Sequence, residues 1–427
     1  MCGTPGEYLR PGTREATVLL CALVLALSLL PAQAASGTTP LGGDWTSLIH
    51  DYSNSRYQAA STITGSNVGT LALRWTIGTT SSVTSTPVVL LGSVYFADWA
   101  GDVYSAAVAT GSVNWEVNLG APISSTPALA NGLVYVAGSP TNSTANGPTR
   151  VWALSQANGR VVWETTIVAQ DNAIWSSPIV YRGMVIVGVS ATGAQENDPA
   201  LKGEVDALNA TNGTPIWTFK TMVGTTGGAS VWGSVAVDPA SKALYFGTGN
   251  AFGPGTSNLY AYSIVSINAL TGRLNWYHQV YSSSQTGGDD DFGSTPNLFT
   301  MQYMGTVHRV VGLGSKDGNY YILDRSTGAL LTKVSVSTGS STGMTGLAGF
   351  MNFGNLEVFV PTGLVTPQCC GAVEAFLPSS GTIVWRFVTP EIVIGSVALI
   401  PGAVLFGDSG GNLYAVRTTI GRMLFHY

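Results

Sequence analysis

One feature constrains the fold of this sequence more than any other: a glycine is followed four positions later by an aromatic residue, and the pair recurs along the chain. Six such pairs are present: Gly111 with Trp115, Gly159 with Trp163, Gly213 with Trp217, Gly272 with Trp276, Gly381 with Trp385, and Gly421 with Phe425. A seventh copy is degenerate, because Thr332 stands four positions after Gly328. Such recurrence indicates copies of one supersecondary unit.

Each repeat has the pattern of four short β-strands. It opens with Ser/Thr-Pro or Gly-Ser, continues with strands rich in Val, Tyr and Ala, and ends with the glycine and the aromatic. Glycine adopts the positive φ of a tight turn between the third and fourth strands, and the aromatic can pack against a neighbouring unit. One such sheet cannot bury both faces, so copies must stack around an axis. We predict an all-β chain folded as a β-propeller of four-stranded blades.

Closure of the ring is left open by the repeat count. Residues 71–77, with Trp75, resemble a closing strand without its three predecessors, and the sequence ends at Tyr427 shortly after the seventh closing pair. In a ring, an N-terminal strand can complete the last blade. The sequence is therefore compatible with a seven-bladed ring or with an incomplete eight-bladed one.

Composition supports this fold and excludes other classes. Only 10% of the residues are charged, 45% are hydrophobic and 53 are glycine, which fits many short strands and tight turns rather than a disordered or coiled-coil chain. The net charge of -5 provides no basic surface, so nucleic acid is excluded as a partner.

The N-terminus has the pattern of an export signal. Arg10 and Arg14 precede an apolar run over residues 16–30, and Ala32 and Ala34 form a small-x-small cleavage site. The run is shorter than the roughly 20 residues that span a bilayer. We predict a signal peptide over residues 1–34, a single propeller domain over residues 35–427 with no membrane span after cleavage, and secretion or a periplasmic location.

The blade topology sorts the irregular segments between the two ends of the ring. Turns between strands one and two and between strands three and four lie at one end, here called the turn end, and all other connections lie at the loop end. The connections at the loop end contain Glu196, Asn250, Lys316, Cys369, Cys370, Trp232 and the run from Asp289 to Asp291. Carboxylate and amide oxygens suit a hard cation such as calcium. The four histidines are scattered, which argues against metal ligation by histidine. No nucleophile elbow or P-loop occurs, which argues against a hydrolase.

Three segments beyond the repeat carry a family resemblance. They are Trp45-Thr46-Ser47 with Asn54-Ser55-Arg56-Tyr57, the stretch from Trp232-Gly233 to Gly249-Asn250, and Lys316-Asp317-Gly318 with Leu323-Asp324-Arg325. On these segments the chain resembles the quinoprotein alcohol dehydrogenases, which use pyrroloquinoline quinone (PQQ), and within them the polyvinyl-alcohol dehydrogenase branch. The resemblance implies the quinoprotein type of ring.

The resemblance also implies roles for individual residues. Trp232 would stack on the planar quinone, and Lys316 would hydrogen-bond its oxygens. Asn250 and Glu196 would ligate Ca²⁺. Asp289 would act as the general base, taking the hydroxyl proton as hydride passes to the quinone, while the metal polarises the quinone carbonyl.

Two departures from the family pattern modify this expectation. Asp291 resembles the extra carboxylate of the lanthanide-dependent members, so it is a candidate metal ligand, and a lanthanide is the alternative ion to calcium. Cys369 and Cys370 lie in the sixth unit, whereas the family has its vicinal disulfide in an early blade. We expect these two cysteines either to form a vicinal disulfide beside the cofactor or to be an ordinary loop pair.

Two classes of function remain from the sequence. The first is a PQQ-dependent alcohol dehydrogenase that passes electrons to a separate acceptor such as a cytochrome or a quinone, because no Cys-x-x-Cys-His haem motif is present. The second is a non-enzymatic propeller that acts as an envelope or extracellular binding scaffold. In that case Trp232 would serve blade packing, and the acidic run would be a solvated loop.

Overall fold

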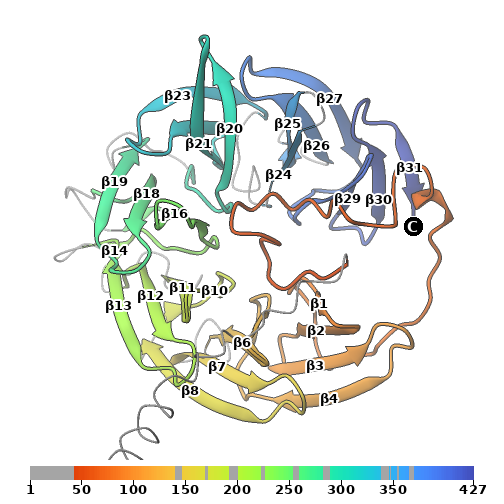
Figure 1. Ribbon diagram of the computed structural model, residues 1–427, viewed down its shortest axis with the longest axis vertical. Coiled ribbons are helices and arrows are strands. Elements are labelled where there is room, and N and C mark those ends of the chain that lie inside the picture. Colours follow the sequence, from red (N-terminus) through yellow and green to blue (C-terminus); the bar gives the residue numbers. More distant parts are fainter. Residues whose placement is uncertain are drawn as a thin grey trace, which may run out of the picture. The chain divides into compact units, whose positions relative to one another are not determined.

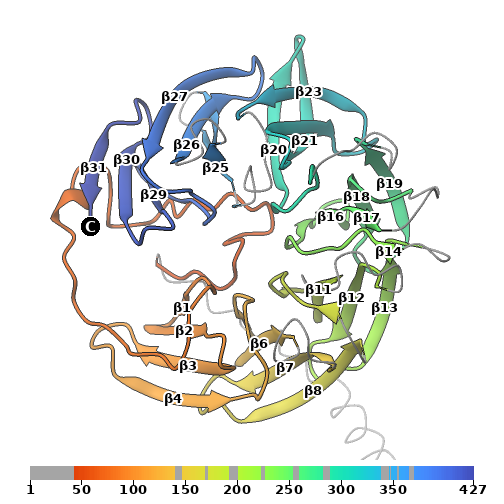
Figure 2. The same cartoon turned by 180° about the vertical axis from the view of Figure 1, so that it is seen from behind.

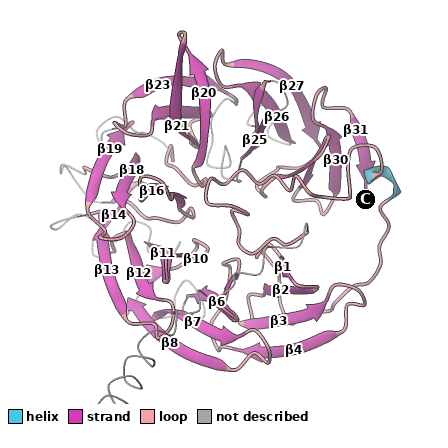
Figure 3. Cartoon of the chain, viewed as in Figure 1, coloured by secondary structure: helices cyan, strands magenta, loops and turns pink. Residues whose placement is uncertain are grey.

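The computed structural model describes residues 43–139, 147–168, 172–191, 201–222, 227–252, 259–281, 289–337, 346, 348–352, 355–364 and 370–427. In these residues the secondary structure is almost entirely β, with one short 3-10 helix, η1 (Val68–Thr70). Seven antiparallel sheets of four successive strands stand as blades around a ring (Figure 1; strands are magenta in Figure 3). The predicted all-β propeller is confirmed, with seven four-stranded blades. No helix in these residues is both long and apolar enough to cross a membrane.

Each blade is formed by four strands in chain order, the first nearest the centre of the ring and the fourth at its rim (Figure 1). Blades 1 to 3 consist of β1 (Val88–Leu90), β2 (Ser93–Ala97), β3 (Asp102–Ala107), β4 (Val113–Asn118); β5 (Ala128–Ala130), β6 (Leu133–Gly138), β7 (Thr149–Ser155), β8 (Val161–Val168); and β10 (Ile179–Tyr181), β11 (Met184–Ala191), β12 (Glu204–Asn209), β13 (Pro215–Lys220). Blades 4 and 5 consist of β15 (Ala236–Asp238), β16 (Ala243–Gly247), β18 (Ser263–Asn268), β19 (Leu274–Gln279); and β20 (Asn297–Tyr303), β21 (Thr306–Gly314), β22 (Asn319–Asp324), β23 (Leu330–Ser335). Blades 6 and 7 consist of β24 (Gly349–Asn352), β25 (Leu356–Leu364), β26 (Cys370–Leu377), β27 (Thr382–Thr389); and β28 (Ala398–Ile400), β29 (Ala403–Gly407), β30 (Leu413–Arg417), β31 (Met423–His426). Three short strands are additional: β9 (Asn172–Ala173), which pairs with β11, and β14 (Gly227–Gly228), which pairs with β17 (Ala251–Phe252).

The glycine and aromatic pairs connect neighbouring blades. Trp115 of blade 1 donates its indole N–H to the carbonyl of Gln156 in blade 2 at 3.0 Å and lies against Gly159 of the same turn. A Cβ on Gly159 would lie 2.7 Å from the indole, and its φ of +72° also favours glycine. The arrangement recurs for Trp163 with Gly213, Trp217 with Gly272, Trp276 with Gly328, and Trp385 with Gly421. Each of these five glycines therefore receives the tryptophan of the preceding blade.

Residues 68–77 connect blade 7 to blade 1. Helix η1 contacts β31, and the indole of Trp75 donates to the carbonyl of Val108 at 2.9 Å and lies against Gly111. Trp75 thus takes the place that a closing aromatic has at the other junctions. Among the described residues, however, 71–77 form no strand and pair with no sheet. The predicted closing strand is therefore not observed, although Trp75 makes the contact of a closing aromatic.

The Ser/Thr residues that open each repeat connect the inner strands. The backbone N–H of Thr86 donates to the Thr126 hydroxyl at 2.9 Å, and that of Thr126 donates to the Ser177 hydroxyl at 2.9 Å. The series continues from Ser177 to Ser234 at 2.8 Å and from Ser234 to Thr295 at 3.0 Å. These hydroxyl groups join blades 1 to 5 around the centre, so equivalent residues of successive blades stand at the same level.

The segment from Trp45 to Arg56 lies inside the ring, as Figures 1 and 2 show from opposite sides. It forms hydrogen bonds with the first strand of every blade, through Val89, Leu129, Val180, Val237, Leu298, Phe350 and Leu399. The buried guanidinium of Arg56 donates to the carbonyls of Leu48 and Val397, and burial lowers its pKa to about 9. This segment therefore connects all seven blades from within.

Candidate active site

Most of the predicted loop-end residues that the structure describes lie in blades 4 and 5 or in the segments that lead into these two blades. Trp232 precedes β15, and Asn250 lies between β16 and β17. The Asp289 to Asp291 run precedes β20, and Lys316 lies between β21 and β22. All are therefore in connections at the loop end of the ring.

Lys316 lies at the centre of this cluster. Its buried ammonium nitrogen is 2.9 Å and 3.0 Å from the two carboxylate oxygens of Asp289 and 2.9 Å from Oδ1 of Asp291. The backbone N–H of Lys316 also donates to the carbonyl of Asp291 at 3.0 Å. The Lys316 ammonium group is thus held between two carboxylates from the junction of blades 4 and 5.

Burial and charge act in opposite directions on these groups. Burial alone lowers the pKa of Lys316, but Asp291 and then Asp289 outweigh it, so the pKa lies above its ordinary value. Burial raises the pKa of Asp291 to about 6 in spite of the neighbouring lysine. The side chain of Asp291 is 6% exposed, whereas that of Asp289 is 36% exposed. Asp289 is therefore the carboxylate that an incoming molecule can reach.

Trp232 forms a flat surface beside the charged groups. Its indole N–H donates to Oδ2 of Asp291 at 3.3 Å, and the Lys316 nitrogen lies 4.6 Å from the ring centroid. A Cβ on Gly293 would lie only 1.9 Å from the indole, so the ring rests directly on that glycine. Cation, carboxylate and backbone contacts together fix the orientation of the indole.

Asn250 contributes an amide oxygen to the cluster. Its Nδ2 donates to Oδ1 of Asp289 at 2.9 Å, while its Oδ1 is buried and has no hydrogen-bond partner among the described residues. A buried carbonyl oxygen without a partner costs free energy, and a hard cation would satisfy it. The described residues contain no group of three or more His, Cys, Asp or Glu side chains arranged to hold a metal. The unpartnered amide oxygen of Asn250 and the buried carboxylate of Asp291 nevertheless fit part of a metal shell.

Two tyrosines support the turn that carries Lys316. Tyr281 and Tyr321 both donate to Oδ2 of Asp317, at 2.7 Å and 2.5 Å. Burial, followed by Asp317 and then Asp289, raises the pKa of the nearby Asp290. Neither the tyrosines nor Gly293 was predicted as part of the site, because they act through contacts between blades that no local motif encodes.

Five of the eight predicted site residues lie together: Trp232, Asn250, Asp289, Asp291 and Lys316. Glu196 and Cys369 lie outside the described residues, so the second calcium ligand and the vicinal disulfide stay predictions. Cys370 is the first residue of β26, at the loop end of blade 6.

The sequence matches the family profile of the glucose/ethanol/alcohol dehydrogenase β-propeller domain, designated PQQ, over residues 45–346. The chain belongs to this family. Quinohemoprotein alcohol dehydrogenase ADH IIB of Pseudomonas putida is 29% identical over 368 residues, which cover 75% of this chain and 51% of that protein. This chain spans about half the length of the curated relatives it matches.

Two solved dehydrogenase structures share the fold. Quinohemoprotein alcohol dehydrogenase ADHIIG from Pseudomonas putida HK5 superposes with a TM-score of 0.77 at 21% identity, covering 90% of this chain and 72% of that one. A europium-containing methanol dehydrogenase superposes with a TM-score of 0.77 at 18% identity, covering 91% and 85%. At these identities the likeness shows the fold alone.

Proposed function

We propose that this chain is a PQQ-dependent dehydrogenase that oxidises an alcohol, with a bound metal ion and Asp289 as the base. Family membership supports the cofactor, and the matched relative is named an alcohol dehydrogenase. The observation that carries the proposal is the convergence of Lys316, two carboxylates, the Asn250 amide and the Trp232 indole at the loop end.

The residues of the cluster fit the groups that this chemistry needs. Trp232, resting on Gly293, offers a face for a planar ring, and the Lys316 ammonium offers a positive charge for its oxygens. The buried Oδ1 of Asn250 and the Asp291 carboxylate would hold the cation, with Glu196 as a further ligand. When bound, PQQ supplies the two-electron acceptor and the metal supplies Lewis acidity.

Asp289 is the proposed base because it is the more accessible carboxylate. It would accept the hydroxyl proton of the alcohol as the carbinol carbon is oxidised to a carbonyl. Lys316 and Asn250 both donate to it, so its carboxylate is held in one orientation. Asp291 is too deeply buried to serve the same purpose.

The experiment mixes purified protein with PQQ and Ca²⁺ and follows dye reduction with a panel of alcohols. Asp289→Asn is expected to reduce turnover by about 10²- to 10⁴-fold while PQQ still quenches tryptophan fluorescence. Glu116→Gln, an exposed carboxylate on β4, is the matched control and is expected to change neither. Absence of PQQ binding to the wild-type protein would refute the proposal and favour the cofactor-free scaffold.

The ion, the acceptor and the location are parts of the same proposal. Calcium is proposed as the metal, and Asp291 is the reason to test a trivalent lanthanide beside it; metal content and activity after reconstitution with Ca²⁺ or La³⁺ decide between them. Electrons would leave to a separate acceptor, a cytochrome or a quinone. Export is proposed from the N-terminal signal, and a mature N-terminus at Ala35 in the sequenced secreted protein would support it.

A further inference from the structure

A second pair of aromatic side chains lies at the loop end, outside the charged cluster. Trp99 lies between β2 and β3 of blade 1, and Trp175 lies between β9 and β10 at the entrance to blade 3. Their ring centroids are 5.7 Å apart, with an angle of 60° between the planes. Trp175 is 43% exposed, whereas the closing indoles of Trp115, Trp163, Trp276 and Trp385 are 8–9% exposed. Blade packing therefore does not account for Trp175.

Trp175 occupies in blade 3 the position that Trp232 occupies in blade 4. Each precedes by two residues a serine in the series of hydroxyl contacts around the ring: Ser177 donates its N–H to the Ser234 hydroxyl, and Ser234 donates to Thr295. The two tryptophans therefore occupy equivalent backbone positions on adjacent blades. A molecule on the Trp99 and Trp175 pair would lie on the same end of the ring as Asp289 and Lys316.

Hydrogen bonds hold the Trp99 indole and the backbone beside Trp175. The Trp99 indole donates to the Thr84 hydroxyl at 2.9 Å, and its turn is capped by the buried Asp98, which accepts from Ala100 and Asp102. The residue before Trp175, Ile174, is fully buried and donates its N–H to the Ser139 hydroxyl at 2.9 Å. Binding would therefore require little ordering of the Trp99 side chain, against which the Trp175 ring lies.

We propose that Trp99 and Trp175 form a platform for the carbon skeleton of the hydroxylated substrate. Exposed indole faces favour C–H-rich surfaces, which a sugar ring and an alkyl chain both present. Two side chains are too small a surface for a stable protein partner, which needs about 800 Å² on each side. The proposal rests on the proposed function, and it adds that alcohols with a skeleton long enough to reach the pair are preferred over short ones.

Binding to the protein without PQQ tests the platform apart from turnover. Maltose, 1-hexanol, ethanol and choline are titrated separately against tryptophan fluorescence. Maltose or 1-hexanol is expected to bind, and Trp175→Ala and Trp99→Ala are each expected to weaken that binding about three- to tenfold. Trp175→Phe should retain most of it, and Tyr427→Ala, an exposed aromatic on the C-terminal residue, should change nothing. Unchanged binding in Trp175→Ala, or binding of choline alone, would overturn the proposal.

Turnover supplies the second measurement. In the PQQ-loaded protein, Trp175→Ala is expected to raise KM for the bound probe and leave kcat for that probe and KM for ethanol unchanged. If no alcohol is oxidised but the variants still lose binding, the platform stands and the dehydrogenase proposal fails. If alcohols are oxidised and Trp175→Ala changes no KM, the platform proposal fails and the dehydrogenase proposal stands.

Discussion

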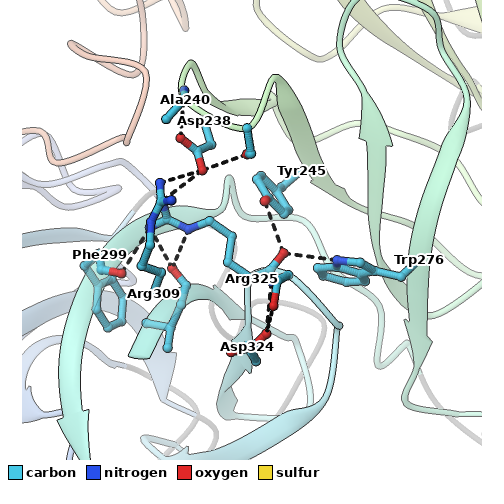
Figure 4. Close-up of polar contacts among 11 residues, drawn as sticks. Asp238, Ala240, Tyr245, Trp276, Phe299, Arg309, Asp324 and Arg325 are labelled. Atoms are coloured by element: carbon cyan, nitrogen blue, oxygen red, sulfur yellow. Dashed lines mark hydrogen bonds and ion pairs between the residues drawn. The ribbon is translucent and has the colours of Figure 1, made fainter. Parts of the chain in front are cut away.

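Asp238 forms a buried ion pair that links blades 4 and 5 at the turn end (Figure 4). Its Oδ2 accepts from Arg309 at 2.7 Å, from Ser241 at 2.8 Å and from Arg325 at 3.4 Å. Arg325 also donates to the carbonyls of Phe299 and Val310 of blade 5. The two arginines differ in environment, since the side chain of Arg309 is 55% exposed and that of Arg325 is 10% exposed.

This difference predicts unequal costs for two substitutions. Asp238→Asn leaves the buried Arg325 charge without its carboxylate, which typically costs about 3 to 5 kcal/mol. Arg309→Gln removes a solvent-screened partner and should cost less than about 1 kcal/mol. Burial opposes ionisation of Asp238, but Ser241 and the two arginines outweigh it, so its pKa lies below the ordinary value. A depressed native pKa means that the stabilisation is fully present above about pH 4 and is lost as the pH falls through the native pKa.

Urea unfolding at pH 7 and at successively lower pH measures both effects. At pH 7 the midpoint for Asp238→Asn is expected far below that of the wild type, with Arg309→Gln close to the wild type. The gap between Asp238→Asn and the wild type should shrink as the pH falls below about 4, because the wild-type carboxyl is then protonated too. Equal costs for the two variants at pH 7, or a gap that persists at the lowest pH, would refute the reasoning.

Two further predictions concern glycines that lie against indoles. Gly293→Ala is expected to weaken PQQ binding by about tenfold or more, because the added Cβ would displace Trp232. Fluorescence quenching measures the affinity, and Gly78→Ala, whose Cβ would meet nothing within 4 Å, is the control. Equal affinities of the two variants for PQQ would contradict the role of Gly293. Gly159→Ala and Gly132→Ala both place Ala at a φ near +73°, but only the Cβ at position 159 would meet an indole. In urea unfolding, the free energy of unfolding of Gly159→Ala should therefore be about 1 to 3 kcal/mol lower than that of Gly132→Ala. Equal losses would mean that backbone strain alone explains the glycine at this position of each repeat.

The fold and the grouping of site residues were predictable because both follow from short-range patterns. The glycine and aromatic pairs identify the blades, and strand order then assigns Trp232, Asn250, Asp289 and Lys316 to one end of the ring. The lysine bridge between two carboxylates was not predictable, because Lys316 is separated from Asp291 by a whole hairpin and its rotamer depends on burial. Gly293 was missed for a similar reason, since only the folded chain brings Trp232 onto it.

The role of residues 45–56 also could not be derived from the sequence. Their motifs were recognised as part of a family resemblance, but a single short segment carries no signal that it contacts seven blades. Its hydrogen bonds join strands from Val89 to Leu399, more than 300 residues apart. Contacts at such separations depend on closure of the ring, which the repeat count left open.

The degenerate fifth repeat shows why loss of one closing indole does not open the ring. A Cβ on Gly381 would lie 3.6 Å from the side chain of Val334 in blade 5, where the other junctions have a tryptophan. A polar contact supplements the junction, because Arg386 of blade 6 donates to the Val336 carbonyl at 3.1 Å while pairing with the buried Glu374. The apolar core shared by blades 5 and 6 also persists. The indole is therefore one of several contacts between neighbouring blades. Blade 5, which carries Lys316, packs against blade 6 through the polar contact and the shared apolar core.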